Sequence, residues 1–250
     1  MGRKARKKSS TGIYHIITRG IGKQILFEDS NDCYYYLHIL NKYKIEHESK
    51  LYCYCLMNNH VHLLIHDTNG TIDCLMKKIG VSYASYYNNK YDRIGTLFQE
   101  RFKSEPIETE RYFKTVFRYI LQNPENAGIS TTEKYIWSSY KEFKNNTSES
   151  TDINFALSVF GGSNQLLDFV KTNNNDDCLE VNTRRITDAE AECIINRELQ
   201  IKSGTIIQSY SKSERDAALN KLKTLGLTIR QIERLTGINR GVVANATKKS

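Results

Sequence analysis

Apolar residues recur with two different periods along the first half of the chain, and they predict an alternation of strands and helices. Strands are predicted over residues 13–18, 51–57, 60–65 and 98–107, and helices over residues 31–47, 72–90 and 108–123. Asn58 and Asn59 predict a hairpin turn, and Pro124 is expected to end the third helix. The first six elements follow the order of a ferredoxin-like βαββαβ domain. The sequence therefore predicts an α+β fold: an antiparallel sheet with helices on one face, and the other face open to carry a site.

The second half of the chain predicts helices separated by polar segments. Residues 146–205 are interpreted as a linker and helical connector, because residues 144–149 are rich in Asn, Ser and Thr. Within residues 206–250, the stretch from Thr228 to Val243 predicts a helix, a Gly-containing turn and a second helix, which is typical of a DNA-binding helix-turn-helix. Its small core is predicted to consist of Ile229, Ile232, Leu235, Ile238 and Val242. The alternative is a helical appendage that packs on the sheet domain or mediates dimerisation.

Charge and composition narrow the function classes. The 250 residues carry a net charge of +8 at pH 7, and a basic chain attracts polyanions, of which nucleic acid is the commonest. Residues 1–10 form a basic N-terminal tail, which either follows a phosphate backbone or is a solvated end. No apolar run approaches the roughly 20 residues that span a bilayer, and no signal-peptide core follows the tail. We therefore expect a cytoplasmic protein without a membrane partner.

Two histidines separated by one residue are the first candidates for chemistry. In the predicted strand, His60 and His62 project from the same face, about 7 Å apart along the strand. Two imidazoles at this spacing can hold one divalent metal ion together with a third ligand from elsewhere in the fold. The alternative is a pair of polar residues on a solvated strand face. His15, in the first strand, is expected to be a packed core histidine, with a place near the site as the alternative.

The third predicted helix supplies a second candidate set. Tyr119 and Asn123 lie one helical turn apart on one face. Asn123 offers a carbonyl oxygen, which suits Mg²⁺ or Mn²⁺, and Tyr119 offers a phenol that can attack phosphorus and become a covalent phosphotyrosine. Tyr112, two turns before Tyr119, is the second candidate nucleophile. The alternative interpretation is an amphipathic tyrosine and a helix-ending asparagine.

Together, the histidine and tyrosine segments resemble those of the single-tyrosine HUH transposases, a family that includes REP-associated tyrosine transposases and insertion-sequence-type transposases. The resemblance rests on residues 57–64 (MNNHVHLL) and 119–124 (YILQNP), with support from residues 14–20 (YHIITRG) and 98–104 (FQERFKS). It covers about residues 11–145, which are thereby interpreted as an HUH catalytic domain. Family members often have Pro before the Asn-His step, where this chain has Asn58; a turn tolerates Asn, so we expect an intact site.

The resemblance implies a metal-dependent single-stranded DNA endonuclease and strand transferase, that is, a DNA transposase. His60, His62 and Asn123 would hold Mg²⁺ or Mn²⁺, and Tyr119 would form a covalent 5′-phosphotyrosine intermediate. The substrate would be single-stranded or hairpin DNA. No nucleotide cofactor is expected, because the ester keeps the phosphodiester energy and the chain has no GxxxxGK[ST] motif.

Candidate DNA contacts lie in both halves of the chain. Those in the sheet domain are Arg19, Arg101 and Lys103, with solvated strand charges as the alternative, and those in the helix-turn-helix are Asn239, Arg240 and Asn245. Related enzymes include dimers in which the tyrosine helix serves the partner's histidines, so a homodimer and assembly of the site in cis or in trans stay open.

Two other function classes are compatible with the sequence. One is a non-catalytic DNA-binding regulator that uses the helix-turn-helix, and the other is an RNA-binding protein on the same sheet topology. The recognised DNA sequence, a mobile or domesticated role, and the physiological metal are also left open by the sequence.

Overall fold

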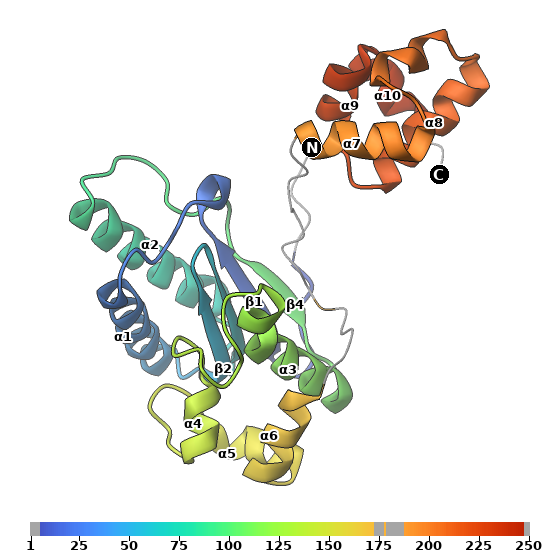
Figure 1. Ribbon diagram of the computed structural model, residues 1–250. Coiled ribbons are helices and arrows are strands. Elements are labelled where there is room, and N and C mark those ends of the chain that lie inside the picture. Colours follow the sequence, from blue (N-terminus) through green and yellow to red (C-terminus); the bar gives the residue numbers. More distant parts are fainter. Residues whose placement is uncertain (1–5, 173–177, 179–187, 248–250) are drawn as a thin grey trace. The chain divides into compact units, whose positions relative to one another are not determined.

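Two compact units, residues 1–180 and 181–250, make up the chain in the computed structural model, which describes residues 6–172, 178 and 188–247. The first unit contains a sheet and helices, and the second is helical (Figure 1). This division differs from the expected boundaries. The described helices within residues 146–205 pack into the core of one unit or the other and do not form a separate connector.

A four-stranded antiparallel sheet forms the centre of the first unit. Its strands are β1 (Ile13–Arg19), β2 (Lys50–Met57), β3 (His60–His66) and β4 (Lys103–Pro106), in the order β2-β3-β1-β4. The hairpin between β2 and β3 turns at Asn58 and Asn59, as predicted. The fourth strand is shorter than the predicted 98–107. Residues 98–102 do not form a ladder of hydrogen bonds with the sheet; a single isolated bridge joins Phe98 to Gly20, the residue after β1.

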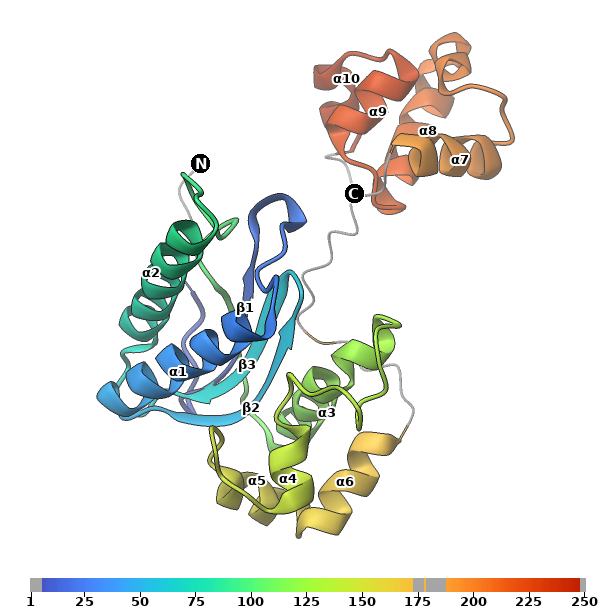
Figure 2. The same ribbon diagram turned by 60° about the vertical axis from the view of Figure 1, so that its left-hand side comes forward.

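Two helices cover one face of this sheet. α1 (Ser30–Glu46) and α2 (Ile72–Lys90) lie side by side there in both ribbon views (Figures 1 and 2). Buried side chains such as Tyr36 and Ile79 pack on alternate strand residues, among them Ile16 and Leu63, because successive strand residues point to opposite faces. This arrangement confirms the predicted ferredoxin-like α+β fold.

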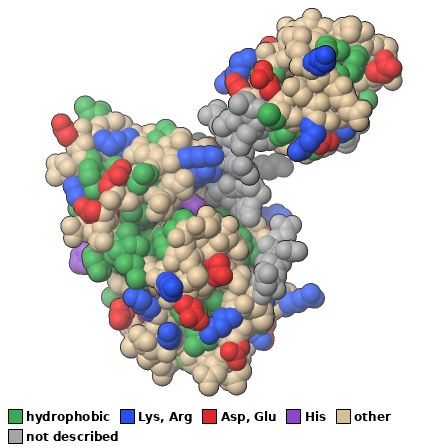
Figure 3. Space-filling view, in the orientation of Figure 1, with side chains coloured by type: hydrophobic (Ala, Val, Ile, Leu, Met, Phe, Trp, Pro, Cys, Tyr) green, Lys and Arg blue, Asp and Glu red, His purple; other side chains and the backbone are tan. Residues whose placement is uncertain are grey.

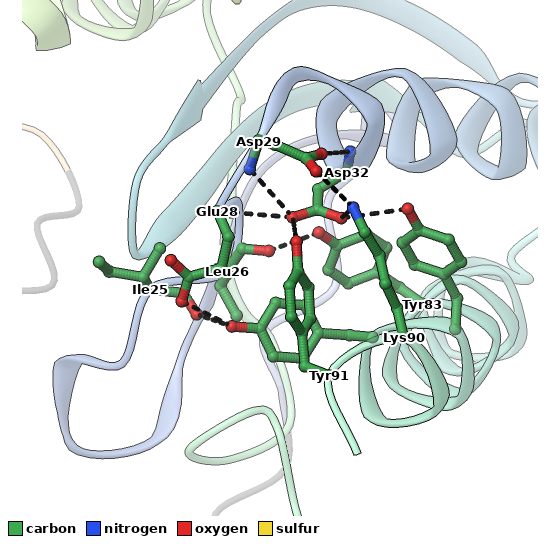
Figure 4. A network of polar contacts seen from close by, with 10 residues as sticks. Ile25, Leu26, Glu28, Asp29, Asp32, Tyr83, Lys90 and Tyr91 are labelled. Carbon is green, nitrogen blue, oxygen red and sulfur yellow. Dashed lines mark hydrogen bonds and ion pairs between the residues drawn. The ribbon is translucent and has the colours of Figure 1, made fainter. Parts of the chain in front are cut away.

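A polar network joins the start of α1 to the end of α2 (Figure 4). The buried Asp32 carboxylate accepts hydrogen bonds from Lys90 Nζ at 2.8 Å, from the Tyr91 hydroxyl at 2.8 Å and from the Tyr86 hydroxyl at 3.1 Å. The Glu28 backbone N–H donates to the same carboxylate at 2.8 Å. A buried carboxylate is tolerated only when it is paired and hydrogen-bonded. The network therefore fixes the two helix ends against each other.

The opposite face of the sheet is covered as well. α3 (Glu110–Asn126) lies across it, and α4 (Tyr140–Asn145), α5 (Ile153–Phe160) and α6 (Ser163–Lys171) pack around α3 (Figure 2). Phe113, Phe117 and Ile120 of α3 are buried in the same core as Leu64 of β3. The sequence predicted that this face would be open, and that prediction is wrong. α3 covers the face and brings its own side chains to it.

The expectation that Pro124 ends the third helix was wrong, because α3 continues to Asn126. A proline deprives the carbonyl four residues earlier of its hydrogen-bond donor, which costs most in the middle of a helix. Here the last turn closes after Pro124: the Ala127 N–H donates to the Asn123 carbonyl at 3.0 Å. One lost hydrogen bond near the end is compatible with two further helical residues.

The second unit consists of α7 (Asp188–Leu199), the 3₁₀ helix η2 (Gly204–Ser209), α8 (Lys212–Thr224), α9 (Ile229–Thr236) and α10 (Arg240–Ala246). α9 begins with a capping box between Thr228 and Gln231 and ends at Gly237, whose φ of +70° suits glycine. Ile232 and Ile238 are buried as predicted, but Val243 fills the core position and Val242 is only partly buried. None of the helices in the described residues is long and apolar enough to cross a bilayer.

Candidate active site

His60 and His62 lie side by side on the sheet face that α3 covers. They occupy alternate positions of β3, and their ring centroids are 4.9 Å apart. His62 is 1% exposed and His60 is partly buried. The two rings therefore lie together on one strand face, as the sequence predicted, and the alternative of a solvated face is wrong because His62 is buried and His60 is partly buried.

A third histidine joins them from the neighbouring strand. His15 of β1 is fully buried and stacks on His62, with ring centroids 5.3 Å apart and an interplanar angle of 24°. His15 Nε2 lies 3.0 Å from His62 Nδ1, which is hydrogen-bond distance. The sequence favoured a packed core histidine at this position and did not assign it to the site. Both descriptions hold, since His15 is buried and also contacts a candidate ligand.

His60 is held by two asparagines. Its Nδ1 lies 2.6 Å from Asn59 Oδ1, and the Asn123 side chain forms a hydrogen bond with the His60 ring. Asn123 Nδ2 also donates to the Tyr119 backbone carbonyl at 3.0 Å, and its amide oxygen is the candidate metal ligand. The structure thus brings Asn123 of α3 to the histidines of β3. The contact from Asn59 was not anticipated.

Tyr119 lies against the histidines of its own chain. Its ring meets the His62 ring edge-on at 5.7 Å and the His15 ring at 5.9 Å between centroids, and 8% of the residue is exposed. α3 presents Tyr119 and Asn123 on one face because they are one turn apart. By contrast, the Tyr112 hydroxyl donates a hydrogen bond to Oε2 of Glu105, a residue of β4, at 2.6 Å. Tyr119 is therefore the candidate nucleophile that contacts His62 and His15.

The three rings are neutral at physiological pH. Burial lowers the pKa of His15 to about 3, and it lowers the pKa of His62 well below its usual value. Burial, followed by the positive charge of Arg19, lowers the pKa of His60 to about 4. Neutral imidazoles are the form that binds metal ions, so no proton has to leave the site when a metal enters.

The donor set fits a divalent metal ion that keeps part of its shell for other ligands. No three His, Cys, Asp or Glu side chains form a metal-binding group within residues 6–172, 178 and 188–247. The candidate ligands are instead two imidazoles and the Asn123 amide oxygen. Both histidines use Nδ1 for an internal contact, which leaves Nε2 for a metal. Two nitrogens and one neutral oxygen leave positions for water or phosphate oxygens on Mg²⁺ or Mn²⁺.

The structure separates the three basic residues that were predicted to contact phosphate. Arg19 pairs with His60 in the β1–β3 register, and Lys103 pairs with Ile17, which places it on the sheet face of His62. Arg101 instead lines a groove with residues of α2, which covers the other face. On the face seen in Figure 3, Lys and Arg are interspersed with Asp and Glu rather than gathered in one patch.

The predicted contacts of the helix-turn-helix lie at the start and end of α10. Arg240 and Asn245 are exposed, whereas Asn239 is the N-cap and its side chain accepts a hydrogen bond from the Gly241 N–H at 2.8 Å. Asn245 lines a hollow of about 440 Å³ together with Lys212 and Arg215 of α8. The exposed side of α10 therefore carries polar and basic groups.

Comparison with known proteins accounts for this arrangement. Residues 8–123 match the family model described as "Transposase IS200 like". These residues belong to the IS200-like transposase family. The matched segment contains His15, His60, His62, Tyr119 and Asn123, and the second unit of the chain lies outside it. The resemblance seen in the sequence is thus confirmed for residues 8–123, and this match supports a DNA transposase.

Two solved structures are similar to this chain. One is a REP-associated tyrosine transposase bound to a REP hairpin, with a TM-score of 0.55 and 12% identity over 75% of this chain and 100% of that chain. This likeness supports the α+β fold. The other is a Deinococcus radiodurans R1 protein assigned as a transposase, with a TM-score of 0.33 and 19% identity over 50% of this chain and 97% of that chain. The curated proteins compared contain no significant match.

Proposed function

We propose that the transposase cuts and rejoins single-stranded DNA through a covalent 5′-phosphotyrosine at Tyr119, and that the reaction depends on a divalent metal ion. The observation that carries this proposal is the contact of the Tyr119 ring with His62, while Asn123 of the same helix is hydrogen-bonded to His60. A nucleophile and a set of neutral metal-binding groups thus meet on one side of the sheet. A non-catalytic DNA-binding regulator would have no need of this juxtaposition.

The residues divide the chemistry between them. His60, His62 and Asn123 would hold Mg²⁺ or Mn²⁺, which supplies Lewis-acid polarisation of the scissile phosphate. Tyr119 Oη forms a bond to phosphorus while the bond from phosphorus to the 3′ oxygen breaks. The phenol gives up its proton and the departing 3′ oxygen gains one, so the products are a 5′-phosphotyrosine and a 3′-hydroxyl. Attack by the 3′-hydroxyl of another strand reverses these steps and rejoins DNA without a nucleotide cofactor.

Single-stranded or hairpin DNA is the proposed substrate. The net charge of +8 favours a polyanionic partner, and Arg19 and Lys103 lie near the histidines on the sheet. The similar REP-associated tyrosine transposase binds a REP hairpin. We further propose that the helix-turn-helix contributes DNA contacts through the exposed Arg240 and Asn245, with Asn239 capping α10.

The active site is proposed to work in cis. His60, His62, Asn123 and Tyr119 of a single chain already lie together, so a second copy is not needed to complete the site. A homodimer, which the sequence left open, is not part of this proposal.

Covalent trapping tests the proposed function. Single strands from both flanks of the gene, labelled at the 5′ end in one set and at the 3′ end in another, are incubated with the full chain and Mn²⁺ or Mg²⁺. We expect a protein–DNA adduct that carries only the 3′ label, and that is absent with a chelator and in Tyr119→Phe. Tyr112→Phe is the matched control and should form the adduct.

The same experiment separates the competing functions. Binding of these strands without an adduct under either metal ion would contradict the nuclease and favour a DNA-binding regulator. Tighter binding of RNA than of the same DNA sequence, again without an adduct, would favour an RNA-binding protein.

A further inference from the structure

We propose that His15 is a positioning residue for the metal ligand His62, an inference that rests on the proposed function. His15 accepts a hydrogen bond from the Nδ1–H of His62 and thereby holds this ring with Nε2 toward the metal. The observation that carries the proposal is the 3.0 Å distance between His15 Nε2 and His62 Nδ1 in two buried, stacked rings.

The direction of this hydrogen bond follows from the number of protons. Each neutral imidazole has one N–H, so one ring donates and the other accepts. If His15 Nε2 donated, the single proton of His62 would be on Nε2, and that nitrogen could not bind a metal. If His62 Nδ1 donates, Nε2 keeps its lone pair and the single proton of His15 lies on Nδ1. Metal binding through His62 Nε2 therefore requires His15 as the acceptor.

Packing alone does not explain a histidine at this position. His15 lies in the middle of β1, flanked by the buried Tyr14 and Ile16, and its Nδ1 is buried without a hydrogen-bond partner among the described residues. A buried polar atom without a partner destabilises a fold, and an apolar ring of similar size would avoid this penalty. The chain thus tolerates a less stable side chain where its other nitrogen contacts a metal ligand. Partners of metal-bound histidines fix both tautomer and ring orientation in this way.

His60 shows the same arrangement with a different acceptor. Its Nδ1 contacts Asn59 Oδ1 at 2.6 Å, so both candidate ligands use Nδ1 internally and present Nε2. Asn59 is the residue before His60, in the hairpin turn. His15 comes from β1, so the orientation of His62 depends on the pairing of two strands.

The test is Mn²⁺ binding to the full chain, measured by isothermal titration calorimetry at pH 7.5. His15→Phe keeps an aromatic ring and removes the acceptor, and we expect its affinity to fall roughly 10- to 100-fold. His15→Gln places an amide oxygen where Nε2 was, so it should bind within about threefold of the wild type. Ile13→Val, a mild change elsewhere on the same face of β1, is the control and should bind as the wild type. Urea unfolding of each variant shows that it is folded.

Each outcome decides the proposal. Wild-type affinity in His15→Phe would overturn it, and so would equal losses in His15→Phe and His15→Gln when both are folded. If His15→Phe does not fold, the ¹⁵N shifts of the histidine rings in the wild type with Mg²⁺ decide instead: an Nδ1 proton on His62 supports the proposal, and an Nε2 proton overturns it. Equal Mn²⁺ binding by the wild type and His60→Ala would show that the proposed metal site itself is wrong.

Discussion

Mn²⁺ binding to the full chain should be almost independent of pH between 7.5 and 5.5. A histidine exposed to water has a pKa near 6.5 and is mostly protonated at pH 5.5, when it cannot bind a metal. Burial and the charge of Arg19 lower the pKa of His60 to about 4, and burial lowers the pKa of His62 well below its usual value. Both ligands therefore stay neutral through this range.

The loss of metal affinity between pH 7.5 and 5.5 is much larger for exposed histidine ligands than for buried ones. At pH 5.5 a histidine with a pKa of 6.5 is neutral in roughly one molecule in eleven, so a site with two such ligands loses about 100-fold in affinity relative to pH 7.5. A histidine whose pKa is about 4 remains neutral in more than nine molecules out of ten at pH 5.5. His60, and His62 whose pKa burial lowers well below its usual value, should together lose less than about twofold.

Calorimetric titration with Mn²⁺ at the two pH values, in buffers that do not bind metal, measures this difference. Circular dichroism and the fluorescence of Trp137, the one tryptophan of the chain, show that the protein is folded at each pH. A loss of 50-fold or more in a folded chain would refute the argument that α3 and the sheet keep these histidines neutral.

Three further predictions concern stability and DNA binding. Asp32→Ala should lower the free energy of unfolding by about 2–4 kcal/mol, because Lys90 and the backbone donors lose a buried acceptor. Urea unfolding followed by Trp137 fluorescence measures this free energy, and a loss below about 1 kcal/mol would contradict the role of the network. The unfolded chain protonates His15 and His60 near pH 6.5, but the folded chain does so only near pH 3 and pH 4. Stability that is present above pH 6.5 is therefore lost as pH falls, by about 1.4 kcal/mol per histidine between pH 7.5 and 5.5. Identical urea midpoints at both pH values would contradict this prediction. Arg240→Ala should weaken duplex DNA binding by about 1 kcal/mol or more, measured by fluorescence anisotropy at fixed salt. Lys202→Ala removes the same charge outside the helix-turn-helix and should change the affinity little. Equal losses of affinity in the two variants would show that net charge alone determines DNA binding.

Local patterns were enough to predict much of the fold. The alternation around Val61 and Leu63 and the spacing of apolar residues in α1 and α2 are properties of single elements, so they can be read without knowing the partners. The cover of the second sheet face by α3 was not predictable in this way. Phe113 and Phe117 show that the helix has an apolar side, but nothing in their spacing says which surface it packs on.

The candidate site shows the same difference between features within one element, which were predicted, and contacts between elements, which were not. His60 with His62, and Tyr119 with Asn123, were found because each pair lies within one element at a characteristic spacing. The roles of His15 and Asn59 depend on strand pairing and on single hydrogen bonds, which the sequence does not show. The sequence held one signal for His15. It lies in the middle of the strand segment Ile13–Ile17, in which every other residue is an isoleucine or Tyr14.

The central claim is that Tyr119 becomes covalently linked to DNA, and mass spectrometry of the trapped adduct tests it most directly. After nuclease and trypsin digestion, cleavage at Arg118 places Tyr119 in a peptide of residues 119–134, whereas cleavage at Arg111 places Tyr112 in residues 112–114. We predict a 5′-phosphonucleotide on Tyr119 in the longer peptide. A nucleotide on the Tyr112 peptide, or an adduct with both tyrosines unmodified, would contradict the claim.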